Sequence, residues 1–289
     1  MARLLHGRPL AERIRAATKE RVVALRGRAI QPHLAVVSVG ADPSSIAYAQ
    51  RLARSGDAAG IRVTGIALPR ETTEEELVRR LEDVDRDPTV HGLLLLTPLP
   101  GPLDEGHIVD HIAVAKDVEG MHPFSVGWLA DGRPRFVPST AEAVIELLKF
   151  YEVPLRGCHA VVVGRSTVIG RPAAYLLLKE DATVTITHKR TVEVSRFTRE
   201  ADLVVVSVGT AGFLRGEMVR PGATVIDAGI NVTPHGITGD VDVETVSAVA
   251  GALSPVPGGL GVVTPALLLR NVVIATERLT AGARKGPAN

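Results

Sequence analysis

Two glycines stand at a spacing typical of a phosphate-binding turn in the segment HAVVVGRSTVIGRP. An apolar run ends at Gly164, a short loop follows, and Gly170 opens an expected helix with Arg171 and Pro172 in its first turn. A helix N-terminus in this position presents N–H groups and the positive end of a dipole to an anion such as a pyrophosphate. Because the full dinucleotide fingerprint has a third glycine, a purely structural strand-to-helix turn explains the motif equally well on its own.

A cluster of cations after the next expected strand favours the binding interpretation. In a unit that binds NAD, a carboxylate about 20 residues further on usually holds the ribose hydroxyls. Here the segment ATVTIT is followed by His188, Lys189 and Arg190, and Arg165 lies in the first loop. Arginine and lysine are suitable partners for a ribose 2′-phosphate, so the pattern predicts NADP as the cofactor. A solvated basic turn is the alternative interpretation.

A polar aromatic residue lies on an expected helix in the N-terminal part of the chain. In PSSIAYAQRLARSG, Tyr48 and Leu52 are four residues apart and share a helix face. A core tyrosine is the structural alternative, although a buried tyrosine also needs a partner for its hydroxyl. His107 and His111 are spaced in the same way, but no third ligand accompanies them. We interpret them as solvated helix residues and expect no metal site.

Alternating helices and strands must position these residues, and their order predicts an α/β fold. A helix is expected from Pro9 to Arg28, followed by a strand at His33–Val39. The segment IRVTGIAL reads as a strand, and TTEEELVRRLEDVDRD reads as a helix that begins with a capping threonine. The unbroken apolar run in HGLLLLTP then indicates a buried strand of a parallel sheet.

The alternation of helices and strands begins again after a loop rich in Gly, Pro and His at residues 119–138. A helix around AEAVIELLKFYE leads to strands expected in HAVVVG, ATVTIT, DLVVVSVG, ATVIDAG and near GALSPVP. The length of 289 residues and the 45% hydrophobic content also favour more than one core. We therefore expect a first domain over residues 1–148 and a second over residues 149–263, with a C-terminal helix within 264–289 joining the first.

The amino-acid composition argues against some classes of binding partner. The 33 basic and 32 acidic residues give a formal net charge of +1 and form no basic block, so nucleic acid is not expected as a partner. No signal peptide and no run of about 18 apolar residues is apparent, so no membrane partner is expected. The single cysteine, Cys158, excludes an internal disulfide and fits a reducing compartment. These features predict a cytoplasmic protein.

Six segments together resemble a known family. They are VGADPSSIAY, TPLPGPLD, KDVEGMHP, GRSTVIGRP, DAGIN and SPVPGGLGVVTP, and their order and spacing are similar to the signature segments of the methylenetetrahydrofolate dehydrogenase/cyclohydrolase family. The resemblance covers nearly the whole chain. It implies an N-terminal α/β folate-binding domain, a Rossmann-type NADP-binding domain, a cleft between them and a homodimer. It also implies hydride transfer from the methylene bridge of the folate to the nicotinamide.

The resemblance assigns roles to particular positions. Tyr48 is similar to the family tyrosine that stacks on the aminobenzoyl ring of the folate. The expected substrate-binding residues are Tyr48, Glu119, Pro257, Gly258 and Gly259. The expected cofactor-binding residues are Gly164, Arg165, Ser166, Gly170, Lys189, Arg190, Asn231 and Thr264. Asp227 precedes Asn231 in DAGIN, where its carboxylate either faces the cofactor or satisfies the local backbone.

Three departures from the family pattern bear on the chemistry. At the catalytic positions beside Tyr48, Leu52 replaces the lysine of YxxxK and Leu96 replaces the glutamine of QLPLP. Cyclohydrolysis moves protons and needs a group of tunable pKa, which a lysine supplies and a leucine does not. Arg51 lies about 100° round the helix from Leu52 and stays protonated, so it is no substitute. Glu119 replaces the aspartate of KDVDG and extends the carboxylate by one methylene.

We therefore hypothesise that the protein is an NADP-dependent methylenetetrahydrofolate dehydrogenase. It would be monofunctional, because its cyclohydrolase activity is expected to be weak or absent. Hydride transfer mainly requires positioning, because the folate nitrogen can push the hydride out. Two alternatives remain open at this point. One is a catalytically silent folate- or nucleotide-binding homologue, and the other is a reductase of a folate-like metabolite.

Overall fold

The computed structural model describes residues 1–40, 43–234 and 236–282. The chain forms two compact units, each assembled from separate parts of the sequence. The three-stranded unit comprises Arg13–Gly127, Arg135–Val137 and Pro265–Asn289, and the six-stranded unit comprises Met1–Glu12, Trp128–Pro134 and Pro138–Thr264. Ala41 and Asp42 of the VGADPSSIAY segment lie outside the described residues, as do residues 283–289 of the expected C-terminal helix.

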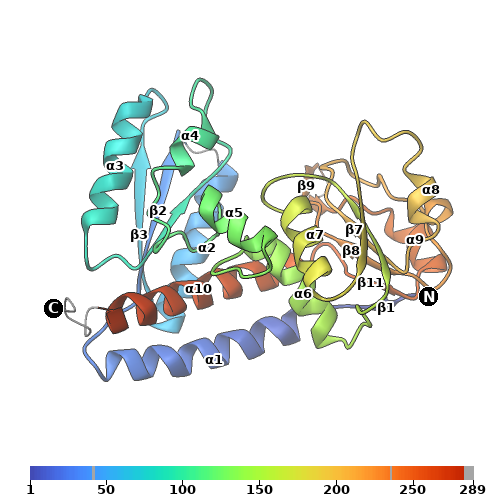
Figure 1. The fold of residues 1–289 in the computed structure, drawn as a ribbon, viewed down its shortest axis with the longest axis horizontal. Helices are drawn as coiled ribbons and strands as arrows, with labels where there is room; N and C mark the ends of the chain where they lie inside the picture. The colour runs from blue at the N-terminus through green and yellow to red at the C-terminus, as the bar shows by residue number, and fades with distance from the viewer. Residues whose placement is uncertain (41–42, 235, 283–289) are drawn as a thin grey trace. The chain divides into compact units, whose positions relative to one another are not determined.

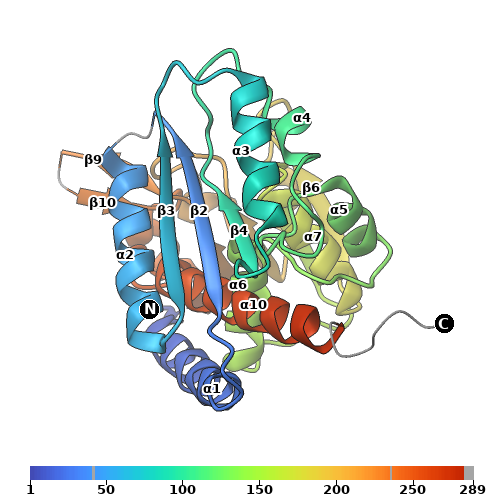
Figure 2. The same cartoon turned by 90° about the vertical axis from the view of Figure 1, so that its left-hand side faces the viewer.

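The three-stranded unit is built on a parallel sheet (Figure 2). Its strand order is β3 (Arg62–Leu68), β2 (His33–Val39), β4 (Gly92–Leu95). Successive side chains of a strand point to opposite faces, so Leu34 and Val36 of β2 pack on one face while Ala35 and Val37 pack on the other. The first face is covered by α1 (Arg8–Arg26), α2 (Pro43–Ala59) and α10 (Leu260–Gly282), and the second by α3 (Glu74–Arg86) and α4 (Glu105–Val109).

Helix α10 completes the core of the three-stranded unit. Its Leu268, Val272 and Val273 have no exposed surface and pack in the cluster that contains Leu34 and Leu52. By length and composition, residues 260–281 are long and apolar enough to cross a membrane, and 61% of this window is buried inside the protein. Core packing accounts for the apolar character of the helix.

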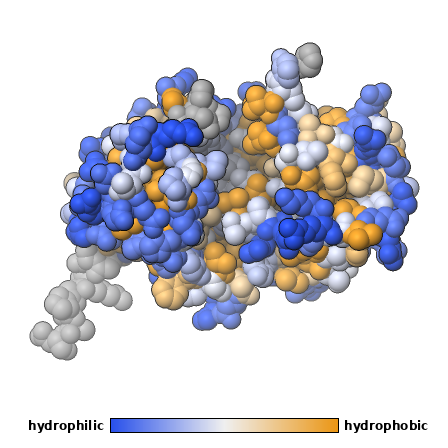
Figure 3. All heavy atoms as spheres, turned by 90° about the horizontal axis from the view of Figure 1, so that it is seen from above, coloured by the Kyte–Doolittle hydropathy of each residue, from blue (hydrophilic) through white to orange (hydrophobic). Residues whose placement is uncertain are grey.

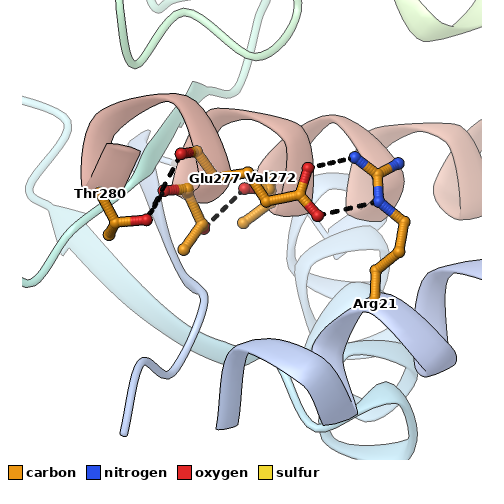
Figure 4. A network of polar contacts seen from close by, with 5 residues as sticks. Arg21, Val272, Glu277 and Thr280 are labelled. Atoms are coloured by element: carbon orange, nitrogen blue, oxygen red, sulfur yellow. Dashed lines mark hydrogen bonds and ion pairs between the residues drawn. The ribbon is translucent and has the colours of Figure 1, made fainter. Parts of the chain in front are cut away.

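An ion pair joins α1 to α10 within the three-stranded unit (Figure 4). The guanidinium of Arg21 donates to both carboxylate oxygens of Glu277, with an Nε to Oε1 distance of 3.0 Å. Thr276 and Thr280 donate to carbonyls one turn back in the same helix, Thr276 to Val272 at 2.8 Å. The two-pronged pair therefore fixes the register of α1 against the helix that carries much of the core.

The six-stranded unit has a parallel sheet of Rossmann type (Figure 1). The strand order is β1 (Arg3–Leu4), β11 (Ala252–Leu253), β8 (Thr224–Asp227), β7 (Leu203–Val206), β5 (His159–Val163), β6 (Thr183–Thr187). Helix α7 (Gly170–Lys179) contacts β5 and β6 and packs with α6 (Ser139–Phe150). The remaining elements of this unit are α8 (Ser195–Thr198), the 3-10 turn Gly216–Met218, α9 (Val243–Val249) and the hairpin β9 (Asn231–Thr233) with β10 (Gly236–Thr238). The residues of α5 (Pro123–Ala130) are divided between the two units after Gly127.

The division into units differs from the expected boundary at residue 148. Residues 138–148 and the first twelve residues group with the six-stranded unit. The reason for the first difference is that α6 packs on α7. The second arises because β1 pairs with β11, where Arg3 is opposite Ala252 and Leu4 is opposite Leu253.

Candidate active site

Tyr48 and both leucines of interest lie in one apolar cluster of the three-stranded unit. Leu52, on α2, is 1% exposed, and the half-buried side chains of Tyr48 and Leu96 pack against the same cluster. The backbone N–H of Leu96 donates to the carbonyl of Val37 at 2.8 Å, which fixes the segment after β4 against β2. Of these three residues, Leu52 is therefore interior, whereas Tyr48 and Leu96 keep partial exposure.

The Tyr48 hydroxyl is held in its protonated form. Burial raises the pKa of Tyr48 strongly, and the negative charge of Glu119 raises it further, while Arg51 acts in the opposite direction. The hydroxyl therefore remains a hydrogen-bond donor at neutral pH and is a poor proton acceptor. The ring can supply an aromatic face, and the charged groups that act on its hydroxyl are Glu119 and Arg51.

The segment that carries Glu119 is fixed by its neighbours. The Asp117 carboxylate accepts hydrogen bonds from the N–H groups of Met121 at 2.9 Å and His122 at 3.0 Å, and from the Ser125 hydroxyl at 2.7 Å. On the other side, Asn271 of α10 donates to the carbonyl of residue 118 at 3.0 Å. Sequence analysis did not identify Asp117, although a carboxylate a few residues before unpaired N–H groups is a common turn signal.

A glycine next to Glu119 makes a close approach that no other residue permits. Gly120 has a φ of +64°, and a Cβ atom there would lie 2.5 Å from the carbonyl oxygen of Phe136. Replacement would therefore move the backbone that holds Glu119. Glu119 consequently extends from a fixed point of the chain.

A small cavity opens beside Leu96 at the carboxyl ends of β2 and β4. Its volume is about 160 Å³. Leu96 is the residue of the expected catalytic and substrate-binding set that lines this cavity. The lining residues are Ser38, Val39, Gly40, Ser45, Arg70, Leu96, Pro98, Leu99 and Pro100. Carboxyl ends of parallel strands are where ligands bind in open α/β sheets, so the cavity extends the surface next to Leu96.

In the six-stranded unit, the loop after β5 makes two close backbone approaches. Gly164 has a φ of +135°, and a Cβ atom there would lie 2.1 Å from the carbonyl oxygen of Ser207. A Cβ atom on Gly170 would lie 2.3 Å from the carbonyl oxygen of Gly164. The two glycines therefore keep the strand-to-helix turn compact, as close cofactor approach requires.

Ser166 modifies the expected anion site at the start of α7. Its hydroxyl oxygen accepts from the N–H groups of Ile169 at 3.2 Å and Gly170 at 3.3 Å, and its carbonyl accepts from Arg171 at 3.0 Å. These N–H groups are therefore not free, contrary to the expectation from sequence. With both lone pairs engaged, the Ser166 O–H itself is left to donate outward, and the helix dipole remains.

The expected cations lie on adjacent loops. Val163 is paired with Thr187 across β5 and β6, and the N–H of Gly164 donates to the carbonyl of Thr187 at 2.9 Å. Arg165, Lys189 and Arg190 follow these strand ends and are exposed. Among the described residues, no ion pair is recorded for any of the three. Their charges are available to a phosphate, and the compact glycine turn beside them fits a dinucleotide.

Two buried carboxylates organise the loops after β7 and β8. Asp227 accepts from the N–H groups of Gly229 at 2.9 Å, Asp240 at 3.0 Å and Val241 at 3.1 Å. The structure thus favours the local-backbone interpretation of Asp227. Burial raises the pKa of Asp227, whereas these three hydrogen bonds lower it. The Asn231 side chain donates to Asp240 at 2.8 Å, and sequence analysis missed Asp240.

The PVPGG turn begins α10. The N–H of Gly259 donates to the carbonyl of Pro255 at 2.7 Å, and Gly258 has a φ of +108°. A Cβ atom on Gly259 would lie 2.6 Å from that same carbonyl oxygen. Pro257 sits within the turn, and the Thr264 hydroxyl donates to the carbonyl of Leu260 at 3.1 Å. The turn is held by its own backbone and by the N-terminal segment, because the N–H of Gly7 donates to the carbonyl of Gly258 at 2.8 Å.

His107 is an ion-pair partner. Its Nδ1 contacts a carboxylate oxygen of Glu74, and this contact raises the pKa of His107. The ring of His111 meets that of His107 edge to face, with the centroids 5.2 Å apart. No group of three or more potential metal-ligating side chains is found within the described ranges.

Comparisons with known proteins give consistent matches over nearly the whole chain. Residues 5–119 match the model of the tetrahydrofolate dehydrogenase/cyclohydrolase catalytic domain, and residues 138–280 match the NAD(P)-binding domain of the same family. The bifunctional protein FolD of Desulforamulus reducens is 42% identical over 273 residues, which cover 94% of this chain and 96% of that protein.

Solved structures agree with this match. The bifunctional methylenetetrahydrofolate dehydrogenase/cyclohydrolase FolD of Campylobacter jejuni has a TM-score of 0.94 at 39% identity, covering 96% of this chain and 99% of that one. The enzyme of Trypanosoma brucei, solved with NADP and an inhibitor, has a TM-score of 0.91 at 33% identity, covering 96% and 98%.

Proposed function

Because the chain belongs to the tetrahydrofolate dehydrogenase/cyclohydrolase family, we propose that it oxidises methylenetetrahydrofolate to methenyltetrahydrofolate and has weak or no cyclohydrolase activity. NADP is the proposed cofactor, and when bound it supplies the acceptor for the hydride. The observation that carries the second part of the proposal is the burial of Leu52, which is 1% exposed in an apolar cluster shared with Tyr48 and Leu96.

The residues of the three-stranded unit suit binding and orientation. In the proposed mechanism, the Tyr48 ring supports the aminobenzoyl ring of the substrate, and its hydroxyl donates a hydrogen bond because its raised pKa keeps it protonated. Glu119 accepts hydrogen bonds from the pterin edge. Pro257, Gly258 and Gly259, which belong to the six-stranded unit, let the backbone approach the substrate in this proposal. The lone pair on the folate nitrogen expels the hydride, so the protein contributes mainly position.

The residues of the six-stranded unit suit the cofactor. Arg165, Lys189 and Arg190 hold the 2′-phosphate, and the Ser166 hydroxyl donates to the pyrophosphate beside the N-terminus of α7. Gly164 and Gly170 keep the turn close enough for these contacts. Asn231 and Thr264 complete the proposed set of cofactor residues.

Hydrolysis of the methenyl product requires a group that can accept and donate a proton, and the leucines of the apolar cluster provide none. Water must be deprotonated as it attacks the methenyl carbon, and a proton must then reach the leaving nitrogen. Leu52 and Leu96 have no titratable atom, and the raised pKa of Tyr48 keeps its hydroxyl protonated, so no phenolate is present to act as the base. Arg51 stays protonated and repels the cationic substrate.

One reaction mixture tests the proposal. The native protein is given methylenetetrahydrofolate and NADP, and the absorbances of NADPH and of the methenyl product are followed together. We expect the two to rise in equal amounts, with the methenyl compound then decaying at the rate seen in buffer. Decay much faster than in buffer contradicts the monofunctional assignment. NADP binding without oxidation favours the catalytically silent homologue or a reductase of a folate-like metabolite.

We also propose that the protein is a homodimer, and the hairpin of β9 and β10 supports this. Val232 and Ile237 are paired across the hairpin, and they are 80% and 48% exposed. Ile230 just before it is 65% exposed, and hydrophobic surface is visible in the space-filling view (Figure 3). Light scattering should give about twice the mass of the 30.5 kDa chain, and V232K should give the monomer. A monomeric native protein contradicts the proposal.

A further inference from the structure

The two buried carboxylates after β8 tie together loops that lie at the carboxyl ends of three neighbouring strands. Asp240 has no exposed surface, and Oδ2 of its carboxylate accepts from the N–H groups of Val208 at 2.6 Å and Gly209 at 2.9 Å. Its Oδ1 accepts from Thr210 N–H at 2.9 Å and from the Asn231 side chain at 2.8 Å. One carboxylate therefore satisfies four donors from the loops after β7 and β8.

Asp227 holds the carboxylate of Asp240 in place. Its Oδ1 accepts from the N–H of Asp240 itself, and its own N–H donates to the Ser254 hydroxyl at 2.8 Å, at the end of β11. The packing leaves no room for side chains. A Cβ atom on Gly239 would lie 1.8 Å from Asp227 Oδ2, and one on Gly229 would lie 2.2 Å from Asp240 Cγ.

The position of these loops in the sheet indicates which part of a dinucleotide they face. In the order β8, β7, β5, β6, the direction of chain progression reverses at β5, so a dinucleotide binds across the carboxyl end of that strand. Lys189 and Arg190 follow β6 and belong to the half that holds the 2′-phosphate. The loops held by Asp240 follow β7 and β8, in the other half of the site, where the nicotinamide end binds.

We propose that Asp240 is a positioning residue for the nicotinamide half of the cofactor, acting through the backbone of residues 208–210 and the side chain of Asn231. This inference rests on the proposed use of NADP. An ionised carboxylate can accept all four hydrogen bonds, whereas an asparagine has one acceptor oxygen and turns an NH₂ group toward N–H donors. D240N should therefore loosen the loops after β7 and β8 and leave the loops after β5 and β6 unaffected.

Two probes separate the halves of the site. NADP occupies both halves, and adenosine 2′,5′-bisphosphate occupies only the half that contains the cations. By titration calorimetry, D240N should raise the dissociation constant of NADP about tenfold or more and change that of adenosine 2′,5′-bisphosphate by less than about twofold. Amide hydrogen exchange of the variant without cofactor should increase at residues 208–210.

A neighbouring residue provides the matched control. The Asp242 side chain accepts from the N–H of Thr245 at 3.1 Å and caps α9. D242N makes the same chemical change two residues from Asp240, but Asp242 contacts neither loop, and asparagine keeps an acceptor oxygen for the cap. This variant should leave the binding of both probes within about twofold of native. If D240N does not fold, N231A removes one of the four donors, and it should weaken NADP about threefold while sparing the smaller probe.

The outcomes are distinct. Equal weakening of both probes by D240N, or none, overturns the positioning role of Asp240, and an N231A variant without a difference between the probes does the same. A native protein that binds neither probe overturns the proposed cofactor, and this inference fails with it. A native protein that binds both, with a D240N variant of unchanged NADP affinity, overturns this inference alone.

Discussion

At the scale of single residues, the cations after β5 and β6 determine the expected choice of cofactor. Arg165, Lys189 and Arg190 are exposed, so a 2′-phosphate gains their charge without displacing a carboxylate partner. We expect NADP to be used at least about tenfold more efficiently than NAD, a preference of roughly 1.4 kcal/mol. The measurement is kcat/KM for both cofactors at moderate salt, and equal efficiency contradicts the assignment.

Replacement of Lys189 and Arg190 by alanine should remove most of this preference. The loss should fall on NADP, because NAD has no phosphate at the ribose 2′ position. K179A is the matched control, since Lys179 is an exposed cation at the opposite end of α7. It should leave the ratio of the two kcat/KM values unchanged.

The leucine pair gives a second prediction at the same scale. L52K combined with L96Q should create measurable cyclohydrolase activity, whereas either change alone should do little. The burial of Leu52 adds a cost, because a lysine there must lose water or stay neutral, and L52K alone should lower stability by several kcal/mol, about 2–5. L52M keeps the apolar volume and should leave the dehydrogenase activity near native. Additive gains from the two single variants contradict the pairing.

Single residues were predicted from sequence where their type and spacing are informative. The glycine turn and the following cations were identified because both sit at strand ends that an apolar run reveals. Asp240 was missed because its four partners come from two segments, residues 208–210 and Asn231, that are distant in sequence and that no local pattern brings together. Ser166 was expected to bind the cofactor, and its hydrogen bonds with the N–H groups of Ile169 and Gly170 depend on a turn geometry that sequence does not specify.

At the scale of elements, the pair between Arg21 and Glu277 should contribute modestly to stability. The side chains are 37% and 36% exposed, so solvent reduces the benefit of the two-pronged geometry. A double-mutant cycle with R21A and E277A, measured by urea unfolding, should give a coupling of about 0.5–1 kcal/mol. The control cycle on the more exposed pair Arg86 and Glu82 should give about 0.3 kcal/mol. A larger coupling in the control pair would contradict the argument.

Sequence predicted the central elements better than the edges. The strand at His33–Val39 has the predicted bounds, and α3 begins one residue after its predicted cap, Thr73. The strand expected in HGLLLLTP ends at Leu95, one residue before Leu96, whose N–H donates to the carbonyl of Val37. The two-residue strand β1 was missed, because two residues are too few to show a pattern. Its partner β11, for which a strand near GALSPVP was predicted, lies near the other end of the chain.

At the scale of the whole molecule, acid should destabilise the fold through two buried histidines. His33 and His91 are 5% and 7% exposed, and burial lowers the pKa of each below 6.5. Nearby positive charge adds to the shift, from Arg62 for His33 and from His33 and Lys116 for His91. The unfolded chain therefore binds more protons, and stability should fall as pH decreases from about 6.5 toward the folded-state pKa values.

A variant isolates this contribution. H91Q has no titrating group, and the Nδ1 atom that it replaces has no hydrogen-bond partner. Urea midpoints at about pH 7.5 and about pH 5 should differ less for H91Q than for the native protein, with at most about 1.4 kcal/mol per pH unit attributable to one histidine. In H107Q the acid loss should persist, because the pKa of His107 is raised and its contribution has the opposite sign. An unchanged pH dependence in H91Q contradicts the prediction.

The division of the chain between the units has a consequence for biosynthesis. The three-stranded unit takes its core helix from residues after 265, and the six-stranded unit takes an edge strand from the first twelve residues. On a ribosome, strands β2, β3 and β4 are therefore made long before α10 is available to cover Leu34 and Leu52. A growing chain exposes that apolar face until α10 has been made, which takes about 10–35 seconds at usual rates of synthesis. A prematurely terminated chain without α10 exposes it permanently. Nonsense mutations late in the reading frame should thus yield insoluble product rather than a working first domain.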